Sequence, residues 1–367
     1  MELIAVLGKA LVALIICLQV TVILLWVERK GSALIQDRVG ANRANLFGGL
    51  LPFNLGIVNT LIADPLKLFH KEDIVPASAD KFLHWLAPWI AVFPLFLTFA
   101  VIPFGDVLVL NGYEINLQAV DLGGGILFVL AMVSLGVYGV IVGGWASNSR
   151  YAFLGGVRGS AQMISYEIAM GLALVSVTLT YGTLDFQTIA RAQGELMWGV
   201  IPAWGIFYQP LAFVLLFIAG MAESKRAPFD LPEAESELVA GFYTEYSGSK
   251  QSMFMMADFI EVAIIAALVT TLFFGGWQVP YLYRDGFHFP GGAFVSVPSL
   301  LVTLLQIASF LVKLFVFCWV QILVRWSLPR LRYDQLMDLG WKKLLPIGLA
   351  NVAATAVLVL ALEGFTV

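Results

Sequence analysis

The sequence predicts an all-α integral membrane protein with about eight transmembrane helices and additional amphipathic helices on the membrane surface. Three observations predict this class: 60% of the 367 residues are hydrophobic, only 13% are charged, and the mean hydropathy is +0.87. A water-soluble domain carries about 25% charged residues on average. The shortfall indicates that much of the surface faces lipid. We expect residues 1–367 to form a single membrane domain.

Eight apolar stretches are long enough to cross the roughly 30 Å hydrocarbon core of a bilayer. The first is too long for a cleavable signal peptide and lacks a small-residue cleavage site, so we interpret it as a membrane helix. The repeated alternation that is typical of a membrane β-barrel is absent from the sequence. The predicted spans cover residues about 3–27, 82–104, 122–147, 161–181, 200–223, 256–280, 296–324 and 344–362.

The loops between these spans differ in their content of basic residues. The first, third, fifth and seventh loops hold 17 Lys and Arg residues together, whereas the other three hold 2. The positive-inside rule assigns the basic loops to the cytoplasm. Because eight spans return the chain to its starting side, both termini are predicted to lie outside.

Two tracts between the spans are predicted to lie along the membrane surface. Residues 46–71 are amphipathic and contain Pro52 and Pro65, which favours broken helices on the cytoplasmic face. Residues 184–198 are the corresponding tract on the outer side.

Several kinds of functional site lack the residues that they need. Cys17 and Cys318 are too few for an iron–sulfur cluster, which takes about four thiolates, and the three histidines have no metal-ligand spacing. No basic stripe or finger motif indicates nucleic-acid binding, and no catalytic triad or nucleotide-binding loop is found. We expect the chain to bind no metal, cofactor or nucleic acid and to carry no catalytic residue of its own.

Ionisable groups within the apolar spans are the most informative residues. A charge at the bilayer centre costs at least about 2.5–3.5 kcal/mol, so such groups usually face a protein interior and serve a function. Lys313 lies deep in the seventh span. The alternative for the groups near span ends is a solvated position at the membrane interface. These groups are Glu167, Glu223, Asp258 and Glu261.

The fifth loop places an acidic cluster on an otherwise basic side of the membrane. Asp230 is followed by carboxylates at the alternate positions Glu233, Glu235 and Glu237, a spacing that favours an extended or turning segment over one helical face. Crowded carboxylates raise each other's pKa, so some would hold protons near neutral pH. A solvated acidic loop is the alternative, but the neighbouring Pro and Phe residues favour an ordered, partly buried loop. Such a line of carboxylates, with a lysine in the membrane, is typical of a proton relay.

At these residues the sequence resembles the membrane subunit 1 family of respiratory complex I, the NADH:quinone oxidoreductase. Five blocks at the expected span boundaries carry the resemblance over nearly the whole chain, and the most extended one includes RAPFDLPEAESEL, which begins at Arg226. The blocks are residues 28–43, 63–73, 161–167, 222–246 and 325–336.

The resemblance implies a subunit that joins the membrane arm of the complex to its hydrophilic arm. It would form much of the quinone tunnel, open a proton path toward other membrane subunits, and act as part of a translocase in a bacterial inner membrane. Quinone would be the substrate, and flavin and iron–sulfur clusters would belong to partner subunits. By itself the chain would have no oxidoreductase activity.

Two sets of site residues follow from the matched motifs. The residues that would line or gate the quinone site are Arg29, Arg38, Asp64, Arg226, Arg325 and Arg330. The proton-relay set is Glu167, Glu223, Glu233, Glu235, Glu237 and Asp258, joined by Lys313 from its position in the seventh span.

The sequence departs from the family pattern in three places. Ala41 stands where the family usually has Pro, and an insertion around residues 51–58 precedes Asp64. In the sixth span the family's Glu-Tyr is Asp258-Phe259, which keeps the carboxylate but loses the phenol. Because the Asp258 side chain is one methylene shorter than the family's Glu, Glu261 could supply a carboxylate that extends farther from the helix.

Two alternative functions are weaker. The homologous subunit of a membrane-bound hydrogenase would lack a quinone, and the long match over residues 226–246 favours the quinone enzyme. A stand-alone proton or sodium transporter should contain inverted repeats, and no convincing internal repeat is found.

Overall fold

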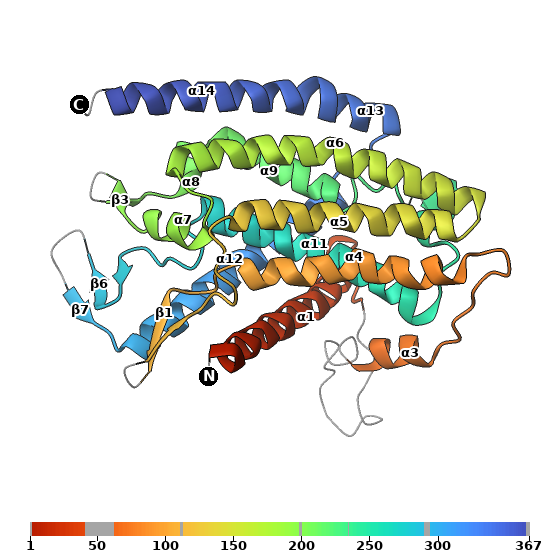
Figure 1. Ribbon diagram of the computed structural model, residues 1–367, viewed down its shortest axis with the longest axis horizontal. Helices are drawn as coiled ribbons and strands as arrows, with labels where there is room; N and C mark the ends of the chain where they lie inside the picture. Colours follow the sequence, from red (N-terminus) through yellow and green to blue (C-terminus); the bar gives the residue numbers. More distant parts are fainter. Residues whose placement is uncertain are drawn as a thin grey trace.

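The computed structural model describes residues 2–40, 62–110, 113–197, 200–233, 235–289 and 294–364. Within these ranges, seven helices are long and apolar enough to cross a membrane, and a shorter apolar helix, α9, accompanies them (Figure 1). Taken in chain order, these helices correspond to the eight predicted spans and confirm a multi-pass helical membrane protein. They are α1 (Glu2–Ile35), α4 (Lys81–Val101), α5 (Gly125–Ala146), α6 (Arg150–Tyr181), α9 (Pro210–Glu223), α11 (Gly248–Phe273), α12 (Ser299–Ser327) and a run containing α13 (Tyr333–Asp338) and α14 (Leu345–Gly364).

The fifth predicted span is shorter than expected because its outer part is interrupted. The chain forms one turn, α8 (Gly205–Tyr208), leaves the helical conformation at Gln209 and starts α9 at Pro210. Proline fits the first turn of a helix because it has no amide hydrogen to leave unpaired. With 14 residues, α9 is about 21 Å long, which is less than the hydrocarbon thickness.

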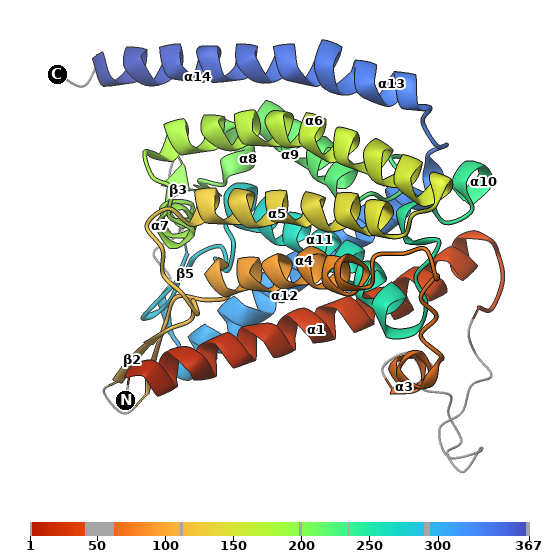
Figure 2. The same ribbon diagram turned by 45° about the vertical axis from the view of Figure 1, so that its right-hand side comes forward.

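Short antiparallel hairpins supplement the predicted all-α architecture. They lie at the same end of the bundle as both termini (Figure 2). Each strand has only two to four residues, so the hairpins pair the backbone of the connections without changing the fold class. The pairs are β1 (Val107–Leu110) with β2 (Tyr113–Asn116), β3 (Leu196–Met197) with β4 (Ile201–Pro202), and β6 (Gly286–His288) with both β5 (Leu282–Tyr283) and β7 (Phe294–Ser296).

Two short helices lie in the predicted surface tracts. At the end opposite the termini, α3 (Asp64–His70) buries none of its residues, while the preceding residues 46–61 lie outside the described part of the chain. At the hairpin end, α7 (Phe186–Ala192) follows Asp185, whose carboxylate accepts hydrogen bonds from the amides of Gln187 and Thr188. This is the usual way in which an aspartate caps a helix start.

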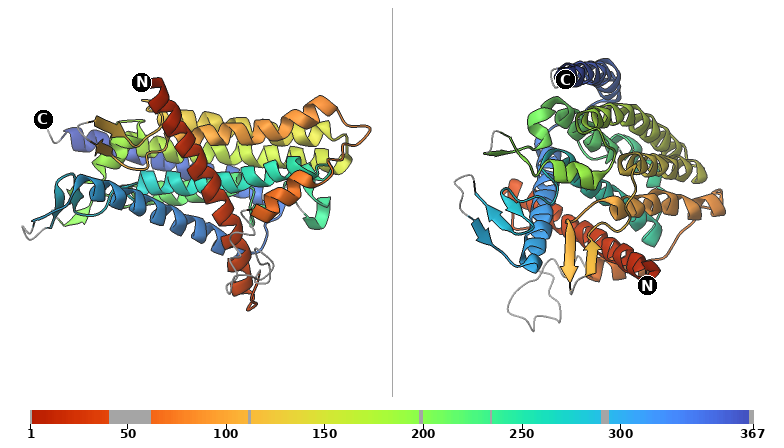
Figure 3. Two further views of the ribbon diagram at one scale, coloured as in Figure 1. Left: turned by 90° about the horizontal axis from the view of Figure 1, so that it is seen from below. Right: turned by 60° about the vertical axis from the view of Figure 1, so that its left-hand side comes forward.

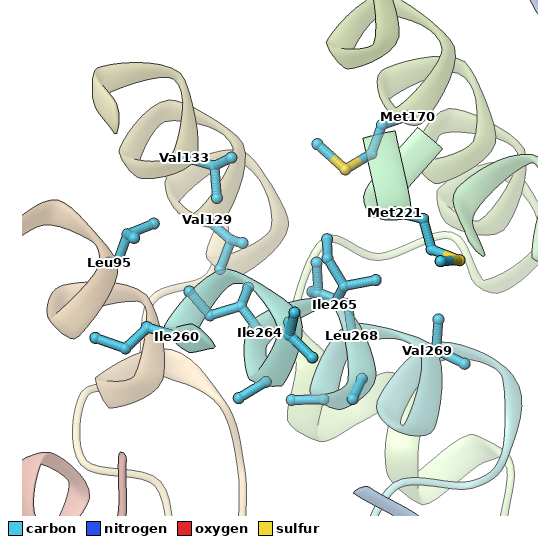
Figure 4. Packing of buried hydrophobic residues seen from close by; sticks show 14 of the residues in the cluster. Leu95, Val129, Val133, Met170, Met221, Ile260, Ile264, Ile265, Leu268 and Val269 are labelled. Atoms are coloured by element: carbon cyan, nitrogen blue, oxygen red, sulfur yellow. The ribbon is translucent and has the colours of Figure 1, made fainter. Parts of the chain in front are cut away.

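Helix α11 forms the centre of the bundle. It packs against α1, α4, α9 and α12, and its residues from Ala257 to Phe273 are buried on every side. A helix that is mostly apolar on all its faces belongs in such an interior, and Asp258 and Glu261 are the charged residues of this buried stretch. Figure 4 shows Ile260 and Ile264 of α11 facing side chains of α4 and α5, with Met170 and Met221 approaching from α6 and α9.

Small residues bring α4 and α5 close together. A Cβ atom added at Gly139 of α5 would lie 2.7 Å from the backbone of Ala91 in α4. Helix α1 crosses the bundle obliquely (Figure 3) and carries Glu28 to the end where the basic loops lie.

Candidate functional site

The loop between α9 and α11, residues 224–247, lies at the end of the bundle opposite the termini and holds the centre of the candidate site. Phe229 and Leu231 are buried. Gln162 of α6, which is fully buried, donates hydrogen bonds to the carbonyl oxygens of Ala222 and Phe229, both at 2.7 Å. The loop is therefore ordered and partly buried, as its Pro and Phe residues predicted.

Glu28 of α1 joins two arginines of the predicted quinone set. Arg226 Nη1 lies 3.4 Å from Glu28 Oε2, and Arg325 Nη1 binds Glu28 Oε1. The guanidinium carbon of Arg226 also lies 4.0 Å from the centre of the Phe259 ring, an arrangement typical of a cation–π contact. The loss of the family's phenol at this position therefore leaves an aromatic face that holds an arginine.

A small cavity opens between these charged groups and apolar side chains of α1, α11 and α12. Its volume of about 20 Å³ holds about one water molecule. Partly buried charged groups therefore border an open space at this end of the bundle. The lining residues are Leu24, Glu28, Met221, Ser224, Arg226, Phe259, Val262, Gln321, Ile322 and Arg325.

Asp230 and Glu233 form an acidic group with Asp258 beside this cavity. Burial raises the pKa of Asp230 to about 6, although Arg330, Arg325 and Arg226 act against it. Burial, followed by the charges of Asp258 and Asp230, raises the pKa of Glu233 to about 8, and the Tyr243 hydroxyl donates a hydrogen bond to it. At pH 7, Glu233 therefore carries a proton for most of the time.

A lysine that the sequence analysis did not select occupies the centre of the site. Lys225 is 3% exposed, and its Nζ lies 2.9 Å from both carboxylate oxygens of Glu261 and 3.1 Å from Asp258 Oδ1. Asp258 and Glu261 are three residues apart on α11 and so share a helix face. Burial lowers the pKa of Lys225, but the two carboxylates outweigh it and raise the pKa above its ordinary value.

The carboxylates continue from Glu261 into the bundle. Glu223 at the end of α9 is fully buried, and neither of its oxygens has a hydrogen-bond partner among the described residues. Coulomb interactions connect Glu223 with Glu261, Lys225 and Glu167. On the α5–α6 face, Glu167 accepts a hydrogen bond from the Ser134 hydroxyl. The series of carboxylates thus runs from the loop toward the lateral surface formed by α5 and α6.

The other predicted quinone residues take different positions. Arg29 Nη1 lies 2.6 Å from Asp64 Oδ2, so this half-exposed pair links α1 to α3 beyond the cavity. Arg38 is exposed and donates to the side chain of Gln36. Arg330 faces the acidic group, where its charge acts on Asp230.

The expected crowding of three alternate carboxylates is wrong for Glu237. This residue belongs to the single helical turn α10 (Glu235–Leu238), and its exposed carboxylate lies 2.7 Å from Arg158 Nη1. The hydrogen bond from Arg158 lowers the pKa of Glu237, so this carboxylate is ionised at neutral pH. The side chain of Glu235 lies outside the described part of the structure.

Lys313 is not brought together with the carboxylates. Its Nζ donates hydrogen bonds to the carbonyl oxygens of Phe274, Gly276 and Gln278 at 2.9, 3.0 and 2.6 Å. All three ammonium donors are used in this way. A helix C-terminus leaves carbonyl groups unpaired and attracts cations, so Lys313 closes the hairpin end of α11.

Sequence reasoning missed Lys225 and passed over Glu28 as part of a motif. A signal for Lys225 was present, because it follows directly after the apolar helix that ends in Glu223 and so stands at the edge of the bilayer. Its partners on α11 are 33 and 36 residues away in the chain. No local pattern identifies them.

Comparison with known proteins relates the chain to one family. Residues 8–356 match the family described as NADH dehydrogenase. The chain is 46% identical to an NADH-quinone oxidoreductase subunit of Geobacter metallireducens, over 95% of this chain and 94% of that protein. Two further subunits of NADH-quinone oxidoreductases are each 42% identical to it. The one from Cytophaga hutchinsonii matches over 91% of each chain, and the one from Rhizobium meliloti matches over 97% of this chain and 99% of that protein.

Proposed function

The chain belongs to the NADH dehydrogenase family, and from this premise we propose that it is the quinone-chamber membrane subunit of a proton-pumping NADH:quinone oxidoreductase. It works only in the assembled complex, where partner subunits hold the flavin and iron–sulfur clusters. It lies in a bacterial inner membrane, with the basic loops in the cytoplasm and both termini in the periplasm. This orientation rests on the 17 basic residues of one set of loops against 2 in the other.

The junction between the charged cavity and the carboxylate series carries the proposal. Arg226 lines the cavity with Glu28, and its charge also acts on Asp230 and Glu233. The quinone head group would approach this cavity from the cytoplasmic end. Its reduction takes two electrons from a partner subunit and two protons from nearby donors.

The acidic group has the proton affinities that such a reaction needs. A general acid works best when its pKa is near the operating pH, and the pKa values of Asp230 and Glu233 are about 6 and about 8. A negative charge that appears about 4 Å from a carboxyl group changes its energy by about 4 kcal/mol at an effective dielectric constant of 20. That is about three pKa units, enough to change which carboxyl groups hold protons.

The proton path we propose runs from Asp230 and Glu233 through Asp258, Glu261 and Glu223 to Glu167. It ends on the α5–α6 face, where another membrane subunit would receive it. The hydrogenase alternative has less support, because the relatives described above are named quinone oxidoreductase subunits.

The proposal is tested in membrane vesicles that hold the assembled complex, by comparing Glu223→Gln with Glu114→Gln. Glu114 is exposed in β2 at the hairpin end and provides the same chemical change far from the path. NADH oxidation by a soluble acceptor, which bypasses the quinone, measures assembly in each variant. We expect Glu223→Gln to lower quinone reduction and proton translocation together by about tenfold or more, while Glu114→Gln stays at wild-type rates. Near-normal rates of both processes in Glu223→Gln would refute the carboxylate path.

A further inference from the structure

Lys225 stands between two groups of carboxylates that belong to different parts of the proposed path. Asp258 interacts electrostatically with Asp230, Glu233 and Arg226, which lie on the cavity side. Glu261 interacts with Glu223, and a Cβ atom on Gly136 of α5 would lie 3.8 Å from its Oε1, so it belongs to the bilayer side. The ammonium of Lys225 touches both.

The backbone of Lys225 has a conformation that is unusual for lysine. The residue has φ +54°, in the left-handed region, directly after the C-cap Ser224 of α9. Glycine and asparagine are the residues that usually occupy this position at a helix end. A lysine there is strained, and its ion pairs to α11 compensate for the strain.

The charges around Lys225 cannot all be neutralised by one ammonium. It faces Asp258 and Glu261 of α11 and Glu223 of α9. Arg226 is paired with Glu28 on the cavity side. The other charged or titratable groups on that side are Arg325, Arg330, Asp230, Glu233 and Tyr243. Glu167 of α6 acts on Glu223 from the far side. Arg226 also acts on Asp258 and Glu261, but it is paired with Glu28. With the Lys225 ammonium as their contacting cation, the three carboxyl groups are neutral together when two of them hold a proton.

From this arrangement we propose that Lys225 is the gating cation of the proton path. The inference rests on the proposed function. Its ammonium, which keeps its three protons throughout, binds whichever of Asp258 and Glu261 is ionised. When Glu223 passes its proton on toward Glu167, Glu261 refills Glu223 and becomes ionised. A proton that then reaches Asp258 from the cavity side releases the ammonium to Glu261, and transfer of that proton from Asp258 to Glu261 returns the ammonium to Asp258.

The two carboxylates are close enough for this exchange. Each has an oxygen within about 3 Å of the same nitrogen, at 3.1 Å for Asp258 and 2.9 Å for Glu261. Lys225 is thus a positioning residue. Its ammonium sets which carboxylate is ionised, and it neither accepts nor releases a proton during the transfer.

The test compares Lys225→Met, Lys225→Arg and the control Lys342→Met in vesicles of the complete complex. Lys342 is an exposed lysine paired with Asp338 on the surface. We expect Lys225→Met to assemble, as judged by NADH oxidation with a soluble acceptor, but to lose about tenfold or more of quinone reduction and pumping at pH 7. Because the ionised carboxylates lose their counter-charge, the acid limb of its pH–rate profile should move upward by about one pH unit or more.

Two further variants separate gating from a purely structural ion pair. Lys225→Arg keeps a permanent positive charge and should retain pumping with a pH profile near that of the wild type. The double variant Lys225→Met with Glu261→Gln removes the ammonium together with one of its two carboxylates and leaves Asp258 as the remaining carboxyl group. It should assemble better than Lys225→Met alone, since replacing buried paired charges by uncharged groups is often harmless to stability, yet remain defective in pumping. Recovery of wild-type pumping in the double variant would show that the pair is only structural and would overturn the inference.

The parallel Glu223→Gln measurement distinguishes this inference from the proposed function. If Glu223→Gln is defective while Lys225→Met keeps the wild-type rate and pH profile, the carboxylate path stands and the gating role is refuted. If Glu223→Gln itself keeps normal quinone reduction and pumping, the proposed function falls first.

Discussion

Glu233→Gln removes the carboxyl group whose proton affinity is best suited to serve a quinone at neutral pH. Glutamine keeps the shape and most of the hydrogen bonding of the protonated side chain, including an acceptor for the Tyr243 hydroxyl. What it cannot do is release and regain a proton. We expect the variant to assemble normally and to lose quinone reduction and proton translocation together.

The magnitude follows from the pKa of about 8, compared with an ordinary value of 4.5. At pH 7 about nine in ten Glu233 side chains are then protonated. Because the folded pKa is raised, the folded state loses stability as the pH rises from about 4.5 to about 8. Glutamine removes that loss, so Glu233→Gln should be more stable than the wild type by up to about 3 kcal/mol at pH 7 and should differ little at pH 4.

Two measurements check this prediction, each beside the matched control Glu237→Gln on the same loop. In the wild type, the rate of quinone reduction should decline at alkaline pH with a midpoint near pH 8. In Glu233→Gln the rate should be low, and this alkaline decline should be absent. Thermal denaturation of the purified complex should show the pH-dependent gain in stability. Glu237 is exposed and paired with Arg158, so its variant should stay within about 0.5 kcal/mol of the wild type. Wild-type rates and an unchanged alkaline decline in Glu233→Gln would refute the reasoning.

Three other perturbations have defined outcomes. Lys313→Met should lower the thermal stability of the complex, because it leaves the carbonyl groups of Phe274 and Gly276 without their donor at about 1–3 kcal/mol each and leaves that of Gln278 with the Ser309 hydroxyl alone. An unchanged melting temperature with an altered pH–rate profile would favour a relay role instead. Gly139→Leu should impair assembly by separating α5 from α4, where even a Cβ would lie 2.7 Å from the Ala91 backbone, and normal yields of complex would contradict this packing. A reporter enzyme that works only in the periplasm should be active when it is fused after the last residue, and one that works only in the cytoplasm should be active when it is inserted beside Glu237. The reverse pattern would contradict the proposed orientation.

The sequence alone predicted the order of the apolar helices, and seven of its eight predicted spans contain a helix of the described structure that is long enough to cross a membrane. Hydrocarbon thickness sets a local requirement that a stretch of about 20 apolar residues meets by itself. Span ends were less certain. Helix α6 begins at Arg150, whereas the apolar stretch suggested residue 161, and α11 covers Gly248–Phe273, whereas the stretch suggested 256–280. Helices continue beyond the lipid wherever neighbouring elements cover them, and hydropathy does not record those neighbours.

Only the tertiary structure decided which charged residues meet. By depth in an apolar span, Lys313 looked like the partner of the carboxylates, yet it binds carbonyl groups at the end of α11. Lys225, which the sequence places in a loop, is the cation between Asp258 and Glu261. Likewise Glu28 meets Arg325 across 297 residues of chain. The partner of a buried charge comes from whichever helix packs beside it, and that choice depends on side-chain packing over the whole bundle rather than on any local pattern.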